Sequence, residues 1–173
     1  MSTGSTLAVL DGGERIEFSF ADMMRYHGPG SPGGVAHAFK VMERAFGVLA
    51  GGEPPQRRDI TVRTAFRGPG ARDGFELVTR AVTQDRFVID PSLERPERGR
   101  THERFVFEVG VGGRRVTLLL RDGYVTEEFI DLARTENRDD AQEERLTLLK
   151  RQMAERVMAS EASDVYEPAG AVV

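Results

Sequence analysis

The sequence predicts a single α+β domain with a mixed or antiparallel sheet, a long core helix after a Gly-Pro-rich loop, and a long C-terminal helix. Three observations predict this class. The chain has 173 residues, which is enough for one domain with its own hydrophobic core. Strand-like and helical segments alternate in the first half of the chain, whereas the second half contains a hairpin pattern around Gly112-Gly113. Apolar residues also recur at helical spacing through residues 32–50.

The core is expected to begin after a loose N-terminal segment, residues 1–13. Residues 15–18 alternate in the manner of a short strand. Ser19 then caps a brief helix that runs through Arg25, because Asp22 stands three residues later, where an acidic residue complements the helix N-terminus.

The clearest helix follows the loop formed by residues 26–34. Ser31 stands at its N-cap, Pro32 at its first position, and Gly51-Gly52 end it. The i, i+3, i+4, i+7 pattern is unbroken and predicts a core helix. The residues of this pattern are Val35, Ala38, Phe39, Met42, Ala45, Phe46 and Leu49.

The following elements are shorter. Residues 60–66 alternate with β-branched side chains and predict a strand. The loop 67–74 opens a helix that we expect to reach about Val82, and residues 86–90 predict a short strand that Pro91 ends.

The second half contains a hairpin and two helices. Thr126 caps a helix. A long charged helix then runs from about Asp139 to Ser160 with one apolar seam, which either packs on the domain or pairs with its copy in a homodimer.

We divide the chain into a flexible N-terminus (1–13), an α+β core (14–135), a C-terminal helix (136–160) and a flexible tail (161–173). The hairpin faces are Phe105, Phe107, Val109 and Val111, opposite Val116, Leu118 and Leu120, and the seam is Leu146, Leu149, Met153 and Val157.

Composition excludes several classes of function. With 28 acidic against 24 basic residues and no tryptophan, the chain has neither the charge nor the stacking surface of a nucleic-acid-binding protein. No apolar run reaches the roughly 18 residues that a membrane span needs, and no leader pattern is present, so we expect no membrane partner and a cytoplasmic location. The absence of cysteine excludes disulfides and thiolate chemistry.

Two loops of similar design are the best candidates for a site. Residues 26–34 (YHGPGSPGG) and 67–74 (RGPGARDG) each deliver a Gly-Pro-Gly turn to a helix start, where N–H groups favour an anion. His27 is the candidate acid or base near neutral pH, and Asp73 is the second catalytic candidate. Both loops also fit ordinary turns, with Ser31 and Asp73 as simple helix caps. The predicted ligand-binding residues are Tyr26, Gly28, Gly30, Ser31, Arg67, Gly70 and Arg72.

These two loops and the order of the elements resemble the E-subunit family of formylmethanofuran dehydrogenase over roughly residues 16–122. That family carries an aromatic-His-Gly-His-x-Cys-Pro-Gly loop before a long helix, and a Cys-Gly-x-Asp-Ala segment at the start of the next. Tyr26, His27 and Gly28 match the first motif, as do Pro32 and Gly33, and Asp73 matches the second. The resemblance implies an α+β core that is often dimeric, so residues 14–135 would be an E-subunit-like core and the protein a homodimer.

The sequence departs from the family at the histidine and cysteine positions that would bind a metal. Pro29 replaces the second histidine, Ser31 replaces the first cysteine and Gly70 replaces the second. A zinc site needs three or four Cys, His or acidic ligands, and His27 with Asp73 alone would make a poor one. The resemblance therefore implies a divergent member without the family's metal and without its C-terminal zinc finger, and we expect no cofactor and no metal.

Three functions remain open. The first is an enzyme or binding protein for a small, anionic metabolite, with a metal-free pocket built by the two loops. The second is a non-catalytic dimeric scaffold or partner-binding protein that has lost the family's metal site. The third is a weak oxygen- and nitrogen-ligated metal site that uses His27 and Asp73. The charged loop 92–104 is either solvated or a lid that reaches a ligand through Arg95, Arg98, Arg100 or His102.

Overall fold

The computed structural model describes residues 4–173 and shows one α+β domain, as predicted. A five-stranded sheet has the order β4-β3-β5-β6-β7. Only β3 and β4 are parallel, and the other neighbours are antiparallel, so the sheet is mixed. Its strands are β3 (Ile60–Thr64), β4 (Phe87–Ile89), β5 (Val106–Val111), β6 (Arg114–Leu120) and β7 (Tyr166–Pro168).

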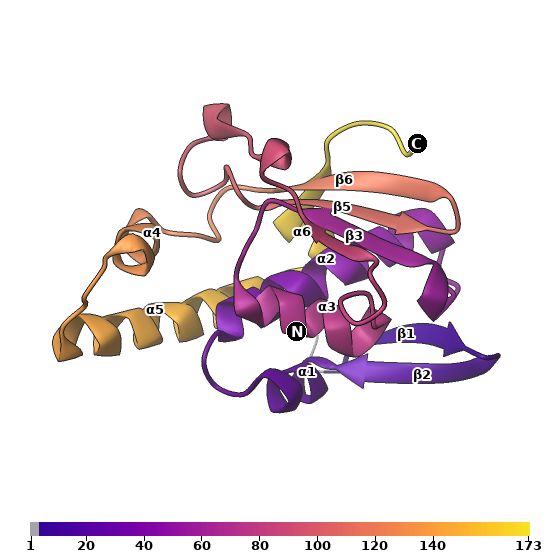
Figure 1. Cartoon of the computed structure of the whole chain (residues 1–173), viewed down its shortest axis with the longest axis horizontal. Coiled ribbons are helices and arrows are strands. Elements are labelled where there is room, and N and C mark those ends of the chain that lie inside the picture. The colour runs from indigo at the N-terminus through magenta and orange to yellow at the C-terminus, as the bar shows by residue number, and fades with distance from the viewer. Residues whose placement is uncertain (1–3) are drawn as a thin grey trace.

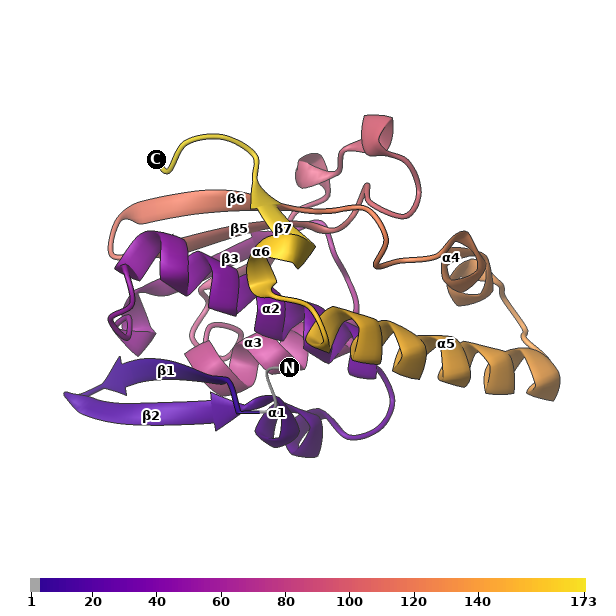
Figure 2. The same cartoon turned by 180° about the vertical axis from the view of Figure 1, so that it is seen from behind.

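Three layers stack on one another (Figures 1 and 2). The sheet forms the first layer, and the helices α2 (Pro32–Ala50) and α3 (Pro69–Thr79) form the second. A two-stranded hairpin and the helix α1 (Phe20–His27) form the third. Because α2 lies between two layers, apolar residues are buried around most of its circumference. It ends at Gly51, whose φ of +60° suits glycine.

The hairpin of β5 and β6 follows the predicted alternation. Phe107 pairs with Leu118 and Val109 with Val116 across the two strands, and all four side chains are buried. Both strands pack against α2 in the second layer (Figure 1). Cross-strand apolar pairs of this kind hold the sheet against the helix. The predicted helix to about Val82 ends earlier, at Thr79, because Arg80 adopts the left-handed conformation of a C-cap.

The N-terminal segment is ordered, contrary to the sequence prediction of a loose segment over 1–13. Residues Thr6–Asp11 form β1, which pairs with β2 (Glu14–Ser19), and Gly12-Gly13 make the turn with φ values of +59° and +86°. Leu7 and Val9 are buried because they alternate onto the face that covers the helices. Residues 1–3 of this prediction lie outside the described residues. The predicted capping box of α1 is confirmed between Ser19 and Asp22.

The C-terminal segment 161–173 also differs from the predicted tail. Ala162–Val165 form the short helix α6, and β7 then pairs with the edge of β6. Tyr166 is fully buried, and the main chain of Val173 exchanges two hydrogen bonds of 2.9 Å with that of Arg115. The edge of β6 offers backbone groups that β7 can pair with, and Val165 and Tyr166 bury their side chains in the core. These two interactions are enough to dock an otherwise polar segment on the domain.

Two helices build an arm at one side of the domain (Figure 1). These are α4 (Glu127–Arg134), which Thr126 caps as predicted, and α5 (Asp140–Met158). The apolar seam of α5 is buried within the chain, where the helix packs on α2 and α4. Of the two predicted uses of this seam, the structure therefore shows packing on its own domain, and a homodimer stays a prediction that needs another surface.

The remaining segments are loops with single 3₁₀ turns. One of them, Arg57–Asp59, leads into β3, and the charged loop after β4 contains two more, Pro91–Leu93 and Pro96–Arg98. Within residues 4–173, no helix is both long and apolar enough to cross a membrane.

Candidate functional site

The two Gly-Pro-Gly loops lie against each other, because α2 and α3 begin side by side. A Cβ atom on Gly70 would come within 2.3 Å of the carbonyl oxygen of Ser31, and one on Gly34 within 3.0 Å of the amide nitrogen of Ala71. The first distance is far shorter than a Cβ contact can be, so only glycine fits at position 70, and the second is tight enough that Ala71 would have to shift. The glycines that the sequence suggested for ligand contact thus first serve to pack the two helix starts together.

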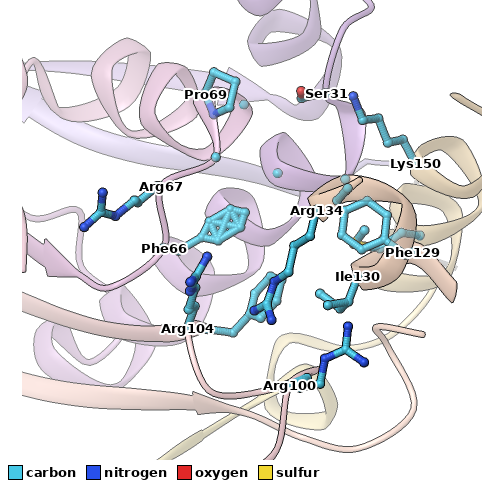
Figure 3. A pocket seen from close by; sticks show the side chains of 17 residues that line it. Ser31, Phe66, Arg67, Pro69, Arg100, Arg104, Phe129, Ile130, Arg134 and Lys150 are labelled. Carbon is cyan, nitrogen blue, oxygen red and sulfur yellow. The ribbon is translucent and has the colours of Figure 1, made fainter. Parts of the chain in front are cut away.

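A cavity of about 320 Å³ opens beside these two helix starts (Figure 3). Its wall is mainly apolar and comes from five parts of the chain: the start of α2, the segment that leads from β3 into α3, the loop before β5, and the helices α4 and α5. Two rings of the wall, Phe66 and Phe105, contact each other with centroids 4.7 Å apart. The apolar side chains are Phe66, Phe105, Phe129, Ile130, Ala133 and Met153.

The charged side chains of the cavity are all cationic. None of the 17 residues of the described chain that line it is aspartate or glutamate. Three of the five cations are paired with carboxylates outside the cavity, so Arg67 and Lys150 are the lining cations without a carboxylate partner in the described chain. The cations are Arg67, Arg100, Arg104, Arg134 and Lys150.

Carboxylates outside the cavity hold three of these arginines in place. Arg104 donates through Nε to Glu94 at 3.1 Å, and Arg134 donates through Nη2 to Glu103 at 3.0 Å. The remaining N–H groups of these two guanidinium groups are left for the cavity, and Figure 3 shows both side chains on the same side of Phe66.

Arg100 is held in the same way from α4. It contacts Asp131 and, at 3.4 Å, Glu127, and the hydrogen bond to Asp131 raises the pKa of Arg100 above its ordinary value. The arginine therefore stays charged at neutral pH. Because its acidic partners belong to α4, this helix is tied to the charged loop across the mouth of the cavity.

Lys150 and Ser31 form the opposite end of the cavity. Lys150 donates through Nζ to the carbonyl oxygen of Gly30 at 3.1 Å. Ser31 stands at the N-cap of α2, but its hydroxyl group makes no capping hydrogen bond in the described part of the chain. The first turns of α2 and α3 also contain no acidic residue. The positive ends of both helix dipoles therefore lie uncompensated beside the cavity.

His27 and Asp73, the two predicted catalytic residues, lie together but outside the set of residues that line the cavity. His27 Nδ1 is 2.7 Å from Asp73 Oδ2, and the His27 side chain is only 8% exposed. Its other ring nitrogen, Nε2, is buried without a hydrogen-bond partner in residues 4–173. A carboxylate on Nδ1 fixes the tautomer that leaves a lone pair on Nε2, which is how a histidine base is oriented.

The other predicted site residues divide between the cavity and its surroundings. Ser31, Arg67 and Gly70 line the cavity, and Arg67 extends toward its outer rim (Figure 3). Gly30 contributes only the carbonyl oxygen that Lys150 binds. Tyr26, Gly28 and Arg72 lie outside the lining, so the structure brings fewer than half of the predicted ligand-binding residues to the cavity.

The charged loop 92–104, which the sequence left as either solvated or a lid, contributes Arg100 and Arg104 to the cavity. Two of the other candidates in this loop have structural contacts. Arg98 donates to the carbonyl oxygen of Leu120 at 2.9 Å, and His102 Nε2 lies 2.8 Å from a carboxylate oxygen of Asp122. The sequence missed Arg134 and Lys150, since each stands on the polar face of a charged helix where nothing local distinguishes it from its neighbours.

A second buried histidine lies behind the cavity wall. His37 Nδ1 is 2.7 Å from the hydroxyl group of Tyr166, and His37 Nε2 is 3.2 Å from the sulfur of Met153, which lines the cavity. Complete burial lowers the pKa of His37 to about 3 and raises that of Tyr166 well above its ordinary value. Both side chains are therefore neutral at neutral pH, and they support the wall rather than carry charge.

The third open function, a metal site, has no suitable set of ligands among the described residues. No group of three or more His, Asp or Glu residues within residues 4–173 is arranged to hold a metal ion. Comparisons with known proteins add no assignment: no protein-family model matches the chain, and no curated protein is significantly similar to it in sequence. The resemblance to the E-subunit family stays a prediction.

Proposed function

We propose that this protein binds a small organic anion with an apolar body in the cavity beside α2 and α3. The single observation that supports this most strongly is the lining: apolar side chains and five cations, with no carboxylate among the described lining residues. Ligand cavities in proteins are mostly apolar with a few convergent polar groups, and this one lies at the lower end of their usual range, roughly 300–1,000 Å³.

Arg104 and Arg134 are the residues that we expect to hold the anionic group. Each keeps unused N–H groups on a planar guanidinium, which matches the oxygens of a carboxylate or phosphate. The outer carboxylates Glu94 and Glu103 fix both side chains before the ligand arrives. This preorganisation lowers the entropy lost on binding, because the long side chains are already ordered.

A matched pair of ligands tests the proposal. In an NMR titration, benzoate should shift the amide signals of cavity residues such as Gly70 and Ala133, whereas benzamide, which has the same shape without the charge, should bind at least about tenfold more weakly. Arg134→Gln should weaken benzoate binding to a similar extent. Arg72→Gln, an exposed arginine outside the cavity, is the control and should leave it unchanged. Equal binding of the two ligands would contradict the proposal.

A second candidate function is acid–base catalysis on the bound anion by His27. The pair His27–Asp73 favours it, since the carboxylate orients the ring and Nε2 has no partner among the described residues. Nε2 lies beneath the loop at Gly30, where a Cβ atom would be 4.0 Å away. A substrate reaches it only if that loop moves. Incubating candidate esters or acids with the protein and with His27→Gln tests this function, which fails if turnover is the same in both.

The contact between His27 and Asp73 also supports the proposed membership of the E-subunit family of formylmethanofuran dehydrogenase. These residues belong to the two separate sequence motifs that carry the resemblance, and the fold brings them to 2.7 Å. The expected cytoplasmic location and the homodimer remain predictions. Sedimentation of the purified protein would test the homodimer.

A further inference from the structure

We infer that the ligand of this cavity carries an anionic group at each end of an apolar body. This inference rests on the proposed function and names the class of ligand: an elongated dianion such as a dicarboxylate or a phosphorylated carboxylate. It follows from the positions of four cations: three arginines lie at one end of the cavity and Lys150 at the other, while Arg67 extends toward the outer rim.

The first end is formed by arginines from the charged loop and α4. Figure 3 shows Arg100, Arg104 and Arg134 on one side of the ring of Phe66. Each is anchored on its outer side by a carboxylate that lies outside the cavity lining. Three guanidinium groups present more donors than a single carboxylate needs, so this end also accommodates a phosphate group.

The second end is formed by Lys150, with Ser31 beside it. Both lie on the other side of Phe66 in Figure 3. The ammonium group of Lys150 uses one donor on the carbonyl oxygen of Gly30, and two more N–H donors are left. The Ser31 hydroxyl makes no capping bond in the described chain, so it is available as a donor to a ligand. The N-termini of α2 and α3 add positive potential at the same place.

Between the two ends the wall is apolar. Phe66 and Ile130 lie between the arginines and Lys150 in Figure 3. A ligand with one charge would fill this part but would place no anionic group at the other end, where the free N–H donors would stay paired with water. A ligand with a charge at each end compensates both groups and buries its middle against the rings.

The test compares ligands that differ only in the second charge. We would titrate a series of linear α,ω-dicarboxylates of increasing length, each against the monocarboxylate with the same number of carbon atoms, at constant ionic strength. The inference predicts one optimal length, at which the dicarboxylate binds about tenfold more tightly than its monocarboxylate. Shorter dicarboxylates should lose this advantage because they cannot reach both ends.

Two conservative variants locate the two ends. Arg134→Gln and Lys150→Gln each remove one charge but keep an amide donor. Each should reduce the preference for the dicarboxylate to about that of the monocarboxylate. Arg151→Gln, an exposed neighbour on α5 outside the cavity lining, is the matched control and should preserve the preference.

The outcomes separate this inference from the proposed function. Equal affinity for both members of every pair would overturn the inference while the anion site itself stands. A preference that survives both Arg134→Gln and Lys150→Gln would place the second charge elsewhere and would also overturn it. If no carboxylate of either kind binds, the proposed function fails together with the inference.

Discussion

His27 Nδ1 lies 2.7 Å from Asp73 Oδ2, and this single contact joins the end of α1 to α3 across 46 residues of sequence. The two side chains come from the two Gly-Pro-Gly loops, whose helices already touch through Gly70 and Ser31. The pair therefore ties the C-terminal end of α1 to α3 beside the cavity, outside its lining.

Removing the carboxylate of this pair should destabilise the fold. Asp73→Ala leaves the largely buried ring of His27 without its only partner in the described chain, and we expect a loss of about 1 kcal/mol, since Asp73 is one-third exposed. Denaturant unfolding measures it. Glu136→Ala, an exposed acid without a hydrogen bond or ion pair in residues 4–173, is the control and should change stability by less than about 0.5 kcal/mol. Equal effects would show that the pair is not structural.

The contact of the two helix starts should not tolerate a methyl group. Gly70→Ala places Cβ 2.3 Å from the carbonyl oxygen of Ser31, so the helices must separate, at a cost of about 1–3 kcal/mol. Gly47 provides the matched control on α2, because no atom lies within 4 Å of the position that its methyl group would take. Gly47→Ala should stabilise the helix by up to about 1 kcal/mol. Thermal unfolding of the two variants should therefore shift in opposite directions, and a shift in the same direction would contradict this packing.

The free energy of unfolding should decrease as the pH falls below about 6.5. Burial lowers the pKa of His37 to about 3 in the folded protein, whereas the unfolded chain takes up a proton near the ordinary value of 6.5. Between these two values the unfolded state binds the additional proton, so stability present above pH 6.5 is lost on acidification, by up to about 1.4 kcal/mol per pH unit. Urea unfolding from pH 7 to pH 5 avoids most carboxylate titrations. His37→Gln should flatten this slope, and an unchanged slope would contradict the assignment.

The last segment of the chain should contribute to stability, although its sequence resembles a tail. Tyr166→Phe removes the hydroxyl group 2.7 Å from His37 Nδ1 and leaves that nitrogen buried without a partner in the described residues. We expect a loss of about 1–3 kcal/mol in the free energy of unfolding. Tyr124→Phe, a tyrosine that makes no side-chain hydrogen bond within residues 4–173, is the control. If both variants are equally stable, the pair does not hold the C-terminal strand.

Local signals in the sequence were enough to predict most of the fold. Ser19, Thr126 and the Gly112-Gly113 turn act through neighbours a few residues away, so the helix caps and the hairpin could be predicted from short segments. The strands β1 and β7 could not. Each is ordered by a partner rather than by its own sequence, β1 by the hairpin with β2 and β7 by the edge of β6.

The site was also predictable only in part, because tertiary contacts rather than local sequence bring most of its residues together. The two Gly-Pro-Gly loops could be paired from their common design, and the structure brings His27 to Asp73. The aromatic wall and the arginine pair could not be predicted, because Phe66, Arg104 and Arg134 come from segments far apart in the sequence. Only the tertiary packing of α4 against the charged loop makes them neighbours.

The most direct test of the central claim is to locate a bound anion by crystallography. Crystals soaked with 4-bromobenzoate should show the anomalous signal of bromine against the apolar wall near Phe66, with the carboxylate between Arg104 and Arg134. The Arg104→Gln, Arg134→Gln double variant should lose the signal under the same conditions. A bromine signal elsewhere on the protein, or one in the cavity that survives in the double variant, would contradict the claim that these arginines form an anion site.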